Sequence, residues 1–251
     1  MSKPIITLTS DFGDTFAKSQ LEAVIYSIAP EAKFLVASNE ITPYSILEGS
    51  FVLQKFYPLT PLGSVHIAII DPGVGSERRG IIIQTTHHWF VGPDNGVLYP
   101  AAKEDGIQSV YVIREDAFGE NVSNTFHGRD VFAKAASYVL QAQQLDQFAY
   151  QVKTESLARF THPPHTIAHI DPYGNAKLTQ KHDGLVPGQT VQITIDNRQI
   201  VLPYVKTFAE VEAGCPLLYL GSHGTLEIAV NQGCAQEYLN LRVGDVVQIQ
   251  V

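Results

Sequence analysis

An aspartate at the end of an apolar segment recurs four times in this chain of 251 residues. These residues, each with a glycine two or three positions further on, are Asp11, Asp71, Asp94 and Asp171. Such aspartates are common in turns, because their carboxylates bond the local backbone, and Asn95-Gly96 predicts a tight hairpin after Asp94. Repetition at strand after strand instead favours a polar site, since open α/β sheets bind ligands beyond the carboxyl ends of their strands.

The segment 71–79 is the strongest candidate for a reaction centre. Asp71 ends the apolar run 65–70, and Arg78 follows after a loop that contains two glycines and a proline. An arginine in this position can keep the aspartate ionised and fix its orientation. His127 opens a predicted helix, and an Asp–His pair can accept or relay a proton. A plain turn at Asp71 and a helix cap at His127 are the alternative.

The composition indicates a globular protein and excludes several classes of partner. Hydrophobic residues make up 45% of the chain and charged residues 17%, which supports a core and argues against disorder. The net charge of −8 and the lack of a Lys/Arg run argue against nucleic-acid binding. No apolar stretch approaches the roughly 20 residues of a membrane span, and no signal-peptide pattern precedes the first strand, so a cytoplasmic location is expected. The two cysteines, Cys215 and Cys234, are too few for a disulfide framework.

Apolar periodicity predicts an α/β N-terminal domain over residues 1–160. Strand-like and helical segments alternate, which is typical of a mixed, mostly parallel sheet flanked by helices. The predicted strands are 5–9, 34–37, 65–70, 80–85, 89–91 and 109–113, and the predicted helices are 16–28, 45–56 and 129–143.

After the loop 161–165 the helical period disappears. The following segments are short, rich in β-forming residues and separated by turns, at 190–195, 199–203, 216–220, 226–230 and 246–251. This pattern predicts a smaller, all-β, barrel-like C-terminal domain over residues 166–251.

Several common ligand sites are disfavoured. Neither a GxGxxG string nor a P-loop follows the first strand, and there is no GxSxG string. Two histidine pairs, His87-His88 and His162 with His165, raise the question of a metal. Neighbouring residues of a strand point to opposite faces, so the first pair cannot easily share an ion. We therefore expect surface or loop histidines, no metal site and no cofactor.

Seven strings taken together resemble the SAM hydroxide adenosyltransferases, which are adenosine-forming S-adenosyl-L-methionine (SAM) hydrolases related to the fluorinase and chlorinase. The strings run in order along nearly the whole chain, at residues 8–13, 41–44, 71–75, 92–96, 125–133, 171–175 and 226–233. The resemblance implies an α/β domain followed by a β-barrel-like domain, assembled as a homotrimer. It also implies that SAM lies at the subunit interface, between the N-terminal domain of one subunit and the C-terminal domain of its neighbour.

The resemblance assigns roles to particular residues. The catalytic set that places and activates water is implied to be Asp71, Arg78 and His127. Asp11 matches a carboxylate that binds the ribose hydroxyls, and Tyr44 an aromatic beside the ribose and sulfonium. Asp171 and Ser222 are implied to contact the amino-acid group of methionine. Asn175 and the backbone near Asn231 and Gln232 are implied to contact adenine. Phe126, Tyr173 and His223, within or next to the matching strings, are the other implied substrate contacts.

The reaction implied is hydrolysis of SAM at C5′, giving adenosine and L-methionine. The sulfonium is already a good leaving group, so the protein must chiefly position and deprotonate a water. Halide transfer to C5′ is an alternative, although Asp71 would repel a halide in a dry pocket. A sensor that binds SAM or adenosine with little turnover is another, because the loop after Asp11 is short and His223 replaces an arginine of the halogenases. The last alternative is an oligomeric α/β protein that binds no ligand.

Overall fold

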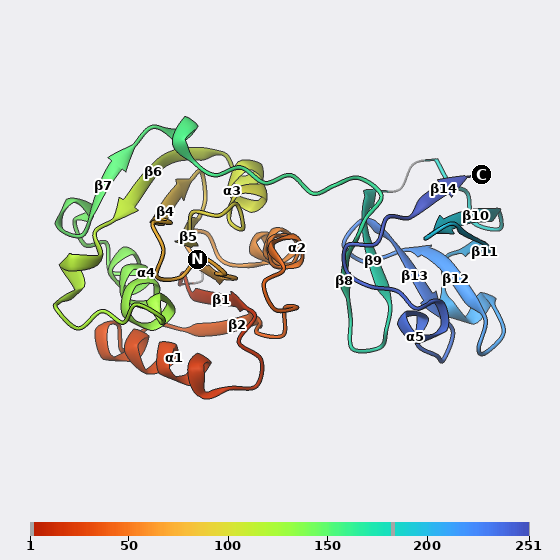
Figure 1. Ribbon diagram of the computed structural model, residues 1–251, viewed down its shortest axis with the longest axis horizontal. Coiled ribbons are helices and arrows are strands. Elements are labelled where there is room, and N and C mark those ends of the chain that lie inside the picture. The colour runs from red at the N-terminus through yellow and green to blue at the C-terminus, as the bar shows by residue number, and fades with distance from the viewer. Residues whose placement is uncertain (1–2, 182–183, 251) are drawn as a thin grey trace. The chain divides into compact units, whose positions relative to one another are not determined.

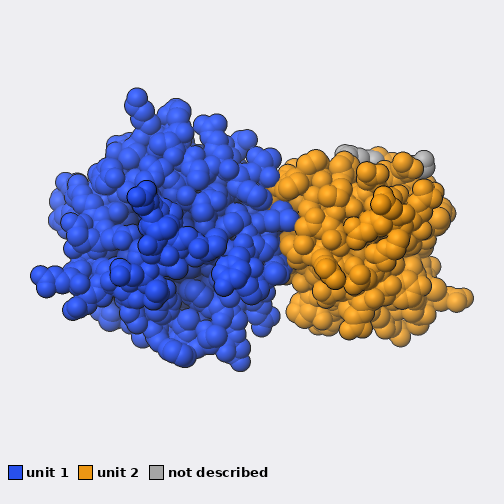
Figure 2. Space-filling model, viewed as in Figure 1, with its two compact units in different colours: residues 1–161 blue, residues 162–251 orange. Residues whose placement is uncertain are grey.

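The computed structural model describes residues 3–181 and 184–250. The chain divides into two compact units, residues 1–161 and residues 162–251, which Figure 2 shows in separate colours. We refer to them as the N-terminal and the C-terminal unit and describe each by itself.

The N-terminal unit is built on a seven-stranded mixed sheet in the order β2-β1-β3-β5-β4-β6-β7. The strands β2, β1, β3 and β5 pair in parallel, whereas β4, β6 and β7 add antiparallel pairs. The expected mixed sheet is confirmed, but parallel pairs do not predominate, because half of the neighbours are antiparallel. The strands are β1 (Ile6–Ser10), β2 (Phe34–Ser38), β3 (Val65–Ile69), β4 (Gly80–Thr85), β5 (Trp89–Pro93), β6 (Ile107–Ile113) and β7 (Ala149–Val152).

Helices cover both faces of this sheet (Figure 1). On one face α1 (Phe16–Ile28) lies beside α4 (Ala133–Leu140), and their apolar residues share a core with β1 and β3. On the other face α2 (Ile46–Phe56) lies beside α3 (Tyr99–Asp105), over a second core. Side-chain oxygens of Thr15 and Ser45 accept backbone N–H groups at the starts of α1 and α2. These caps explain why both helices begin close to where the sequence predicts them.

The predicted helix 129–143 differs from the structure at both ends. It opens as a π-helical turn, η3 (Gly128–Phe132), in which the Ala133 N–H bonds the carbonyl of Gly128, five residues earlier. The α-helical part, α4, follows and ends at Leu140. Such π-helical turns are rare in proteins, but those that occur are often found at functional sites. Here the turn directly follows His127.

The C-terminal unit contains a second seven-stranded sheet, in the order β14-β10-β11-β12-β13-β9-β8. The two edges approach each other, because Thr166 next to β8 forms a bridge with Val246 next to β14. The sheet therefore curls into a partial barrel around its own apolar core. Its elements are β8 (Ile167–Ile170), β9 (Ala176–Lys181), β10 (Thr190–Ile195), β11 (Arg198–Val205), β12 (Pro216–Leu220), β13 (Thr225–Val230), α5 (Ala235–Leu239) and β14 (Gln248–Gln250).

Within residues 3–181 and 184–250, no helix has both the length and the apolarity needed to cross a membrane. The same residues contain no cluster of three or more His, Cys, Asp or Glu side chains arranged to hold a metal ion.

A histidine cluster lies at the end of the N-terminal unit's sheet where β3 and β5 begin. His66 is fully buried, with Nδ1 2.8 Å from Thr7 Oγ1, and its ring lies 5.2 Å from that of His88. His87 and His88 both direct Nδ1 at Asp105, at 2.9 and 3.2 Å. Both histidines lie in the loop between β4 and β5, as expected, but His88 is buried, 4% exposed. The expectation that the two rings point to opposite faces is wrong, because this segment is a turn rather than a strand and both rings reach Asp105. The turn between β4 and β5 folds the His88 ring inward beside His66.

The burial of His66 makes the free energy of unfolding depend on pH. Burial, and secondarily His88, lowers its pKa from 6.5 to about 3, while Asp105 acts in the opposite direction. The unfolded chain therefore binds a proton below pH 6.5 that the native protein does not. We expect the free energy of unfolding to be highest above this pH and to fall below it, by at most about 1.4 kcal/mol per pH unit from this residue.

This dependence can be measured by urea unfolding at several pH values from about 7.5 down to about 5, a range in which the native state is expected to persist. The matched variant His66→Asn should be less stable at neutral pH but should lose less stability on acidification. Parallel pH dependences in the two proteins would exclude His66 as the cause.

Candidate active site

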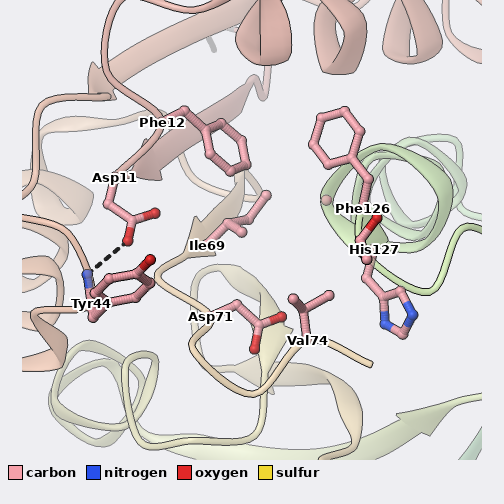
Figure 3. A pocket seen from close by; sticks show the side chains of 10 residues that line it. Asp11, Phe12, Tyr44, Ile69, Asp71, Val74, Phe126 and His127 are labelled. Atoms are coloured by element: carbon pink, nitrogen blue, oxygen red, sulfur yellow. Dashed lines mark hydrogen bonds between the residues drawn. The ribbon is translucent and has the colours of Figure 1, made fainter. Parts of the chain in front are cut away.

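A pocket opens in the N-terminal unit beyond the carboxyl ends of β1 and β3 (Figure 3). Asp11 follows β1 and Asp71 follows β3, and the parallel register that pairs Ser10 with Ile69 brings both carboxylates to the same edge of the sheet. The pocket thus gathers five predicted site residues from four distant segments. Its lining residues are Asp11, Phe12, Tyr44, Ile69, Asp71, Val74, Thr125, Phe126, His127 and Gly128.

Arg78 holds Asp71 from behind the pocket. Its Nε lies 2.9 Å from Oδ1 of Asp71, and its Nη2 lies 2.5 Å from Oδ2. Both side chains are largely buried, 10% and 6% exposed, and the guanidinium lies over the ring of Phe132. A two-point, charge-assisted contact of this kind is strong and fixes the plane of the carboxylate. Nη1 of Arg78 is buried without a partner among the described residues, which leaves a donor for a bound water.

His127 joins the same group. Its Nδ1 lies 3.1 Å from Nη2 of Arg78, and its side chain is 6% exposed. An arginine can only donate, so in this contact Nδ1 accepts and the neutral ring carries its proton on Nε2. The structure thus connects Asp71, Arg78 and His127, which the sequence predicts as one set. The arrangement can hold a water and take a proton from it.

Asp11 and Tyr44 form the opposite wall of the pocket. The backbone N–H of Tyr44 donates to Oδ2 of Asp11 at 2.9 Å, and Figure 3 shows the tyrosine ring beside this carboxylate. Tyr44 adopts a left-handed backbone with φ of 68°, a conformation that costs a bulky residue about 1–3 kcal/mol. Tyr44 is 71% exposed, so core packing does not explain the strain. The conformation instead directs an aromatic surface to the pocket mouth.

Aromatic rings complete the pocket. Phe12 and Phe126 meet edge to face, with ring centroids 5.9 Å apart. Sequence reasoning did not select Phe12, Val74 or Thr125, although each belongs to one of the strings quoted above. Two carboxylates combined with aromatic faces form a site suited to a cationic group on a partly apolar molecule.

The C-terminal unit gathers a second group of predicted residues. Oδ1 of Asp171 accepts the N–H groups of Tyr173 and Asn175, both at 3.0 Å, and its Oδ2 accepts the Asn175 amide at 3.1 Å. Burial opposes ionisation of Asp171, but the bonds from Asn175 and the charge of Lys177 lower its pKa overall. A surface hollow nearby is lined by Tyr173, Asn175, Phe208, Val230, Asn231, Gln232 and Gly233. Phe208 is the aromatic that sequence reasoning missed.

Ser222 and His223 lie outside the hollow of the C-terminal unit. They form the turn between β12 and β13, where Oγ of Ser222 is 3.1 Å from Nδ1 of His223. Their roles at the substrate stay predictions.

Comparison with known proteins identifies the family. Two family models, described as the SAM hydroxide adenosyltransferase N-terminal and C-terminal domains, match residues 6–149 and 165–248. The chain belongs to the SAM hydroxide adenosyltransferase family. The resemblance drawn from the seven strings is therefore confirmed.

Relatives along the full length agree with this assignment. The chain is 33% identical to a protein of Methanocaldococcus jannaschii named (R)-S-adenosyl-L-methionine hydrolase, over 98% of this chain and 95% of the relative. A fluorinase of Nocardia brasiliensis is 24% identical over 99% of this chain and 97% of its own. A crystal structure described as an uncharacterized conserved protein from Thermotoga maritima superposes with a TM-score of 0.91, at 28% identity, over 98% of this chain and 100% of that chain.

The geometry around Asp11 predicts a contribution to nucleoside binding. Only one of its carboxylate oxygens is used by a hydrogen bond among the described residues, so the other is left for a hydroxyl donor. A hydrogen bond to a charged acceptor is worth about 1.5–3 kcal/mol. We expect Asp11→Ala to raise the Kd for adenosine roughly 10- to 150-fold.

Isothermal titration calorimetry with adenosine measures this effect. The control is Asp14→Ala, which removes an exposed carboxylate three residues away that does not line the pocket. Equal affinity of Asp11→Ala and the control would remove Asp11 from the site.

Proposed function

We propose that this protein hydrolyses SAM at C5′ by means of an activated water, giving adenosine and L-methionine. The observation that carries the proposal is the Arg78–Asp71 pair, with His127 against the same guanidinium, in a pocket that also contains Asp11. The full-length relatives named as S-adenosyl-L-methionine hydrolases support the same chemistry.

The pocket residues have complementary roles in this reaction. The oxygen of a water bonds to C5′ while the C5′–S bond breaks. The electron pair of the C5′–S bond stays on sulfur, and methionine leaves as a neutral thioether. The proton of the water passes to Asp71 or His127 and then to solvent. Arg78 orients the Asp71 carboxylate through a two-point contact. The sulfonium, being cationic, is attracted by the carboxylates and aromatic faces that line the pocket.

The substrate contacts divide between the two units. In the N-terminal unit, Asp11 accepts the ribose hydroxyls, and Tyr44 and Phe126 pack along the ribose and sulfonium. In the C-terminal unit, Tyr173, Asn175, Asn231 and Gln232 bind adenine. The amino-acid end of the substrate is held by Asp171, Ser222 and His223.

We further propose that the active form is a homotrimer with its sites at subunit interfaces. Each unit carries only part of the required contacts, with the reacting groups in one and the adenine contacts in the other. A pairing between neighbouring subunits supplies both parts to each substrate.

The relatives' name narrows the substrate further. In (R)-S-adenosyl-L-methionine the α-carbon is already fixed by the prefix L, so the descriptor (R) refers to the sulfonium centre. We therefore expect this protein to prefer the (R) epimer at sulfur over the (S) epimer.

The test is incubation with each epimer in buffers with and without chloride or fluoride, followed by chromatography. Adenosine and methionine in equal amounts, faster from the (R) epimer, support the proposal. A halogenated nucleoside would indicate the transferase alternative, which Asp71 disfavours because an anion there repels a halide. Binding of SAM without any product would indicate a sensor and overturn hydrolysis.

A further inference from the structure

A carboxylate outside the predicted catalytic set also contacts His127. Oε1 of Glu115 lies 3.3 Å from Nδ1 of the histidine, the same nitrogen that faces Nη2 of Arg78 at 3.1 Å. Glu115 begins the short helical turn η2 (Glu115–Phe118) after β6. Its side chain is 40% exposed, so one end of the contact reaches solvent.

The two partners of Nδ1 require opposite protonation states. Arg78 can only donate, so its contact needs Nδ1 without a proton. An ionised Glu115 can only accept, so its contact needs Nδ1 to carry one. In either state one contact is attractive and the other is not. Uptake of a proton by His127 therefore transfers its hydrogen bond from Arg78 to Glu115.

The turn that carries Glu115 is held in place at both ends. The N–H of Arg114 bonds the carbonyl of Phe148 at 2.8 Å, and Lys134 Nζ bonds the carbonyl of Phe118 at 3.2 Å. The ring of Phe118 stacks on Tyr138 at 5.8 Å. The position of Glu115 is thus set by contacts with α4 and the segment before β7, and its approach to His127 is part of the fold.

We propose that Glu115 is a positioning residue that stabilises the protonated form of His127 during SAM hydrolysis. The inference rests on the proposed function. Water loses a proton as its oxygen bonds to C5′, and Nδ1 takes this proton, because it is the ring nitrogen with an electron pair when Nε2 carries the proton of the neutral ring. The hydrogen bond from Nη2 of Arg78 to Nδ1 is released in the same step. Nδ1–H then donates to Glu115, and the proton leaves to solvent when the ring is restored. The charged groups that face the ring are Asp71, Arg78 and Glu115, with Asp11 on the opposite wall of the pocket.

The test compares Glu115→Gln, which keeps the size of the side chain and removes its charge, with Asp116→Asn. The control removes an equal charge from the next residue of the same turn, which is exposed and has no contact with His127 among the described interactions. Because Glu115 is partly exposed, we expect kcat for Glu115→Gln to fall about two- to fivefold. The acidic limb of its pH–rate profile should move to lower pH, and Asp116→Asn should match the wild type.

A second measurement does not depend on activity. NMR follows the ring signals of the nine histidines with pH, and His127→Gln identifies the signal of His127. In Glu115→Gln the midpoint of that titration should move to lower pH, and in Asp116→Asn it should not. If it does not move in Glu115→Gln, the contact has no role. If it moves while kcat and the pH–rate profile stay unchanged, the pair is only structural and the proposal is overturned.

The two measurements separate the inference from the proposed function. A wild-type protein that hydrolyses neither epimer of SAM would refute the function. The ring titration would still decide whether Glu115 stabilises protonated His127.

Discussion

Asp71→Asn is expected to bind SAM and to lose nearly all hydrolysis. Asparagine keeps the shape of the side chain, so the pocket is retained, but it neither accepts a proton nor balances the buried charge of Arg78. Removal of an acid–base group commonly lowers the rate about 100- to 10,000-fold. Single-turnover measurements of adenosine formation, with calorimetry for SAM binding, check both parts of this expectation.

The protein contains its own matched control for this variant. Arg79 and Asp94 form a second Arg–Asp pair, with Nε 3.0 Å from Oδ2, whose carboxylate also accepts the N–H of Ala158. This pair does not line the pocket. Asp94→Asn should lower the melting temperature with little change in kcat. Near-normal turnover in Asp71→Asn would rule out its role as the catalytic carboxylate.

Mixed assemblies should recover activity that neither parent variant has. Asp71→Asn damages the reacting groups of the N-terminal unit, and Asn175→Ala damages the proposed adenine contacts of the C-terminal unit. If each site combines units of two subunits, random co-assembly leaves roughly one quarter of the sites with both halves intact. Co-expressed subunits should therefore exceed the mean activity of the two separate variants, assayed at low SAM concentration.

The control for the mixing experiment is the pair of variants combined after assembly, without exchange of subunits. Light scattering establishes the mass of the active species. An active monomer, or co-expressed subunits no more active than the mean of the two variants, would overturn the shared site.

The sequence predicted the pocket because its main residues follow strands. Apolar runs end at Asp11 and Asp71, and adjacent parallel strands bring such ends together whatever the remaining topology. His127 and Arg78 could also be predicted from the sequence, because His127 lies in the string that opens a helix and Arg78 lies in the loop that follows Asp71. Local pattern and family resemblance together therefore identified the group that the structure connects.

Other features depend on contacts between distant segments. Glu115 contacts His127 only because the segment after β6 folds back on α4. The amino-acid pattern around either residue does not predict this contact. Asn95 predicted a hairpin, but its amide instead bonds the carbonyl of Ile70 at 2.8 Å and its turn leads into α3. That helix is seven residues long with Pro100 in its first turn, too short for a clear apolar period. The left-handed backbone of Tyr44 is likewise fixed by its bond to Asp11.

The π-helical turn after His127 has a consequence for engineering. It accommodates one residue more than an α-helical turn, so deleting a residue within Gly128–Phe132 would restore a regular helix. Because each helical residue turns the chain by about 100°, the shortened helix would swing His127 away from Arg78 while α4 stayed packed. Stabilising redesign of this segment would therefore disturb the proposed role of His127, and sequence libraries meant to raise thermal tolerance should keep its length fixed.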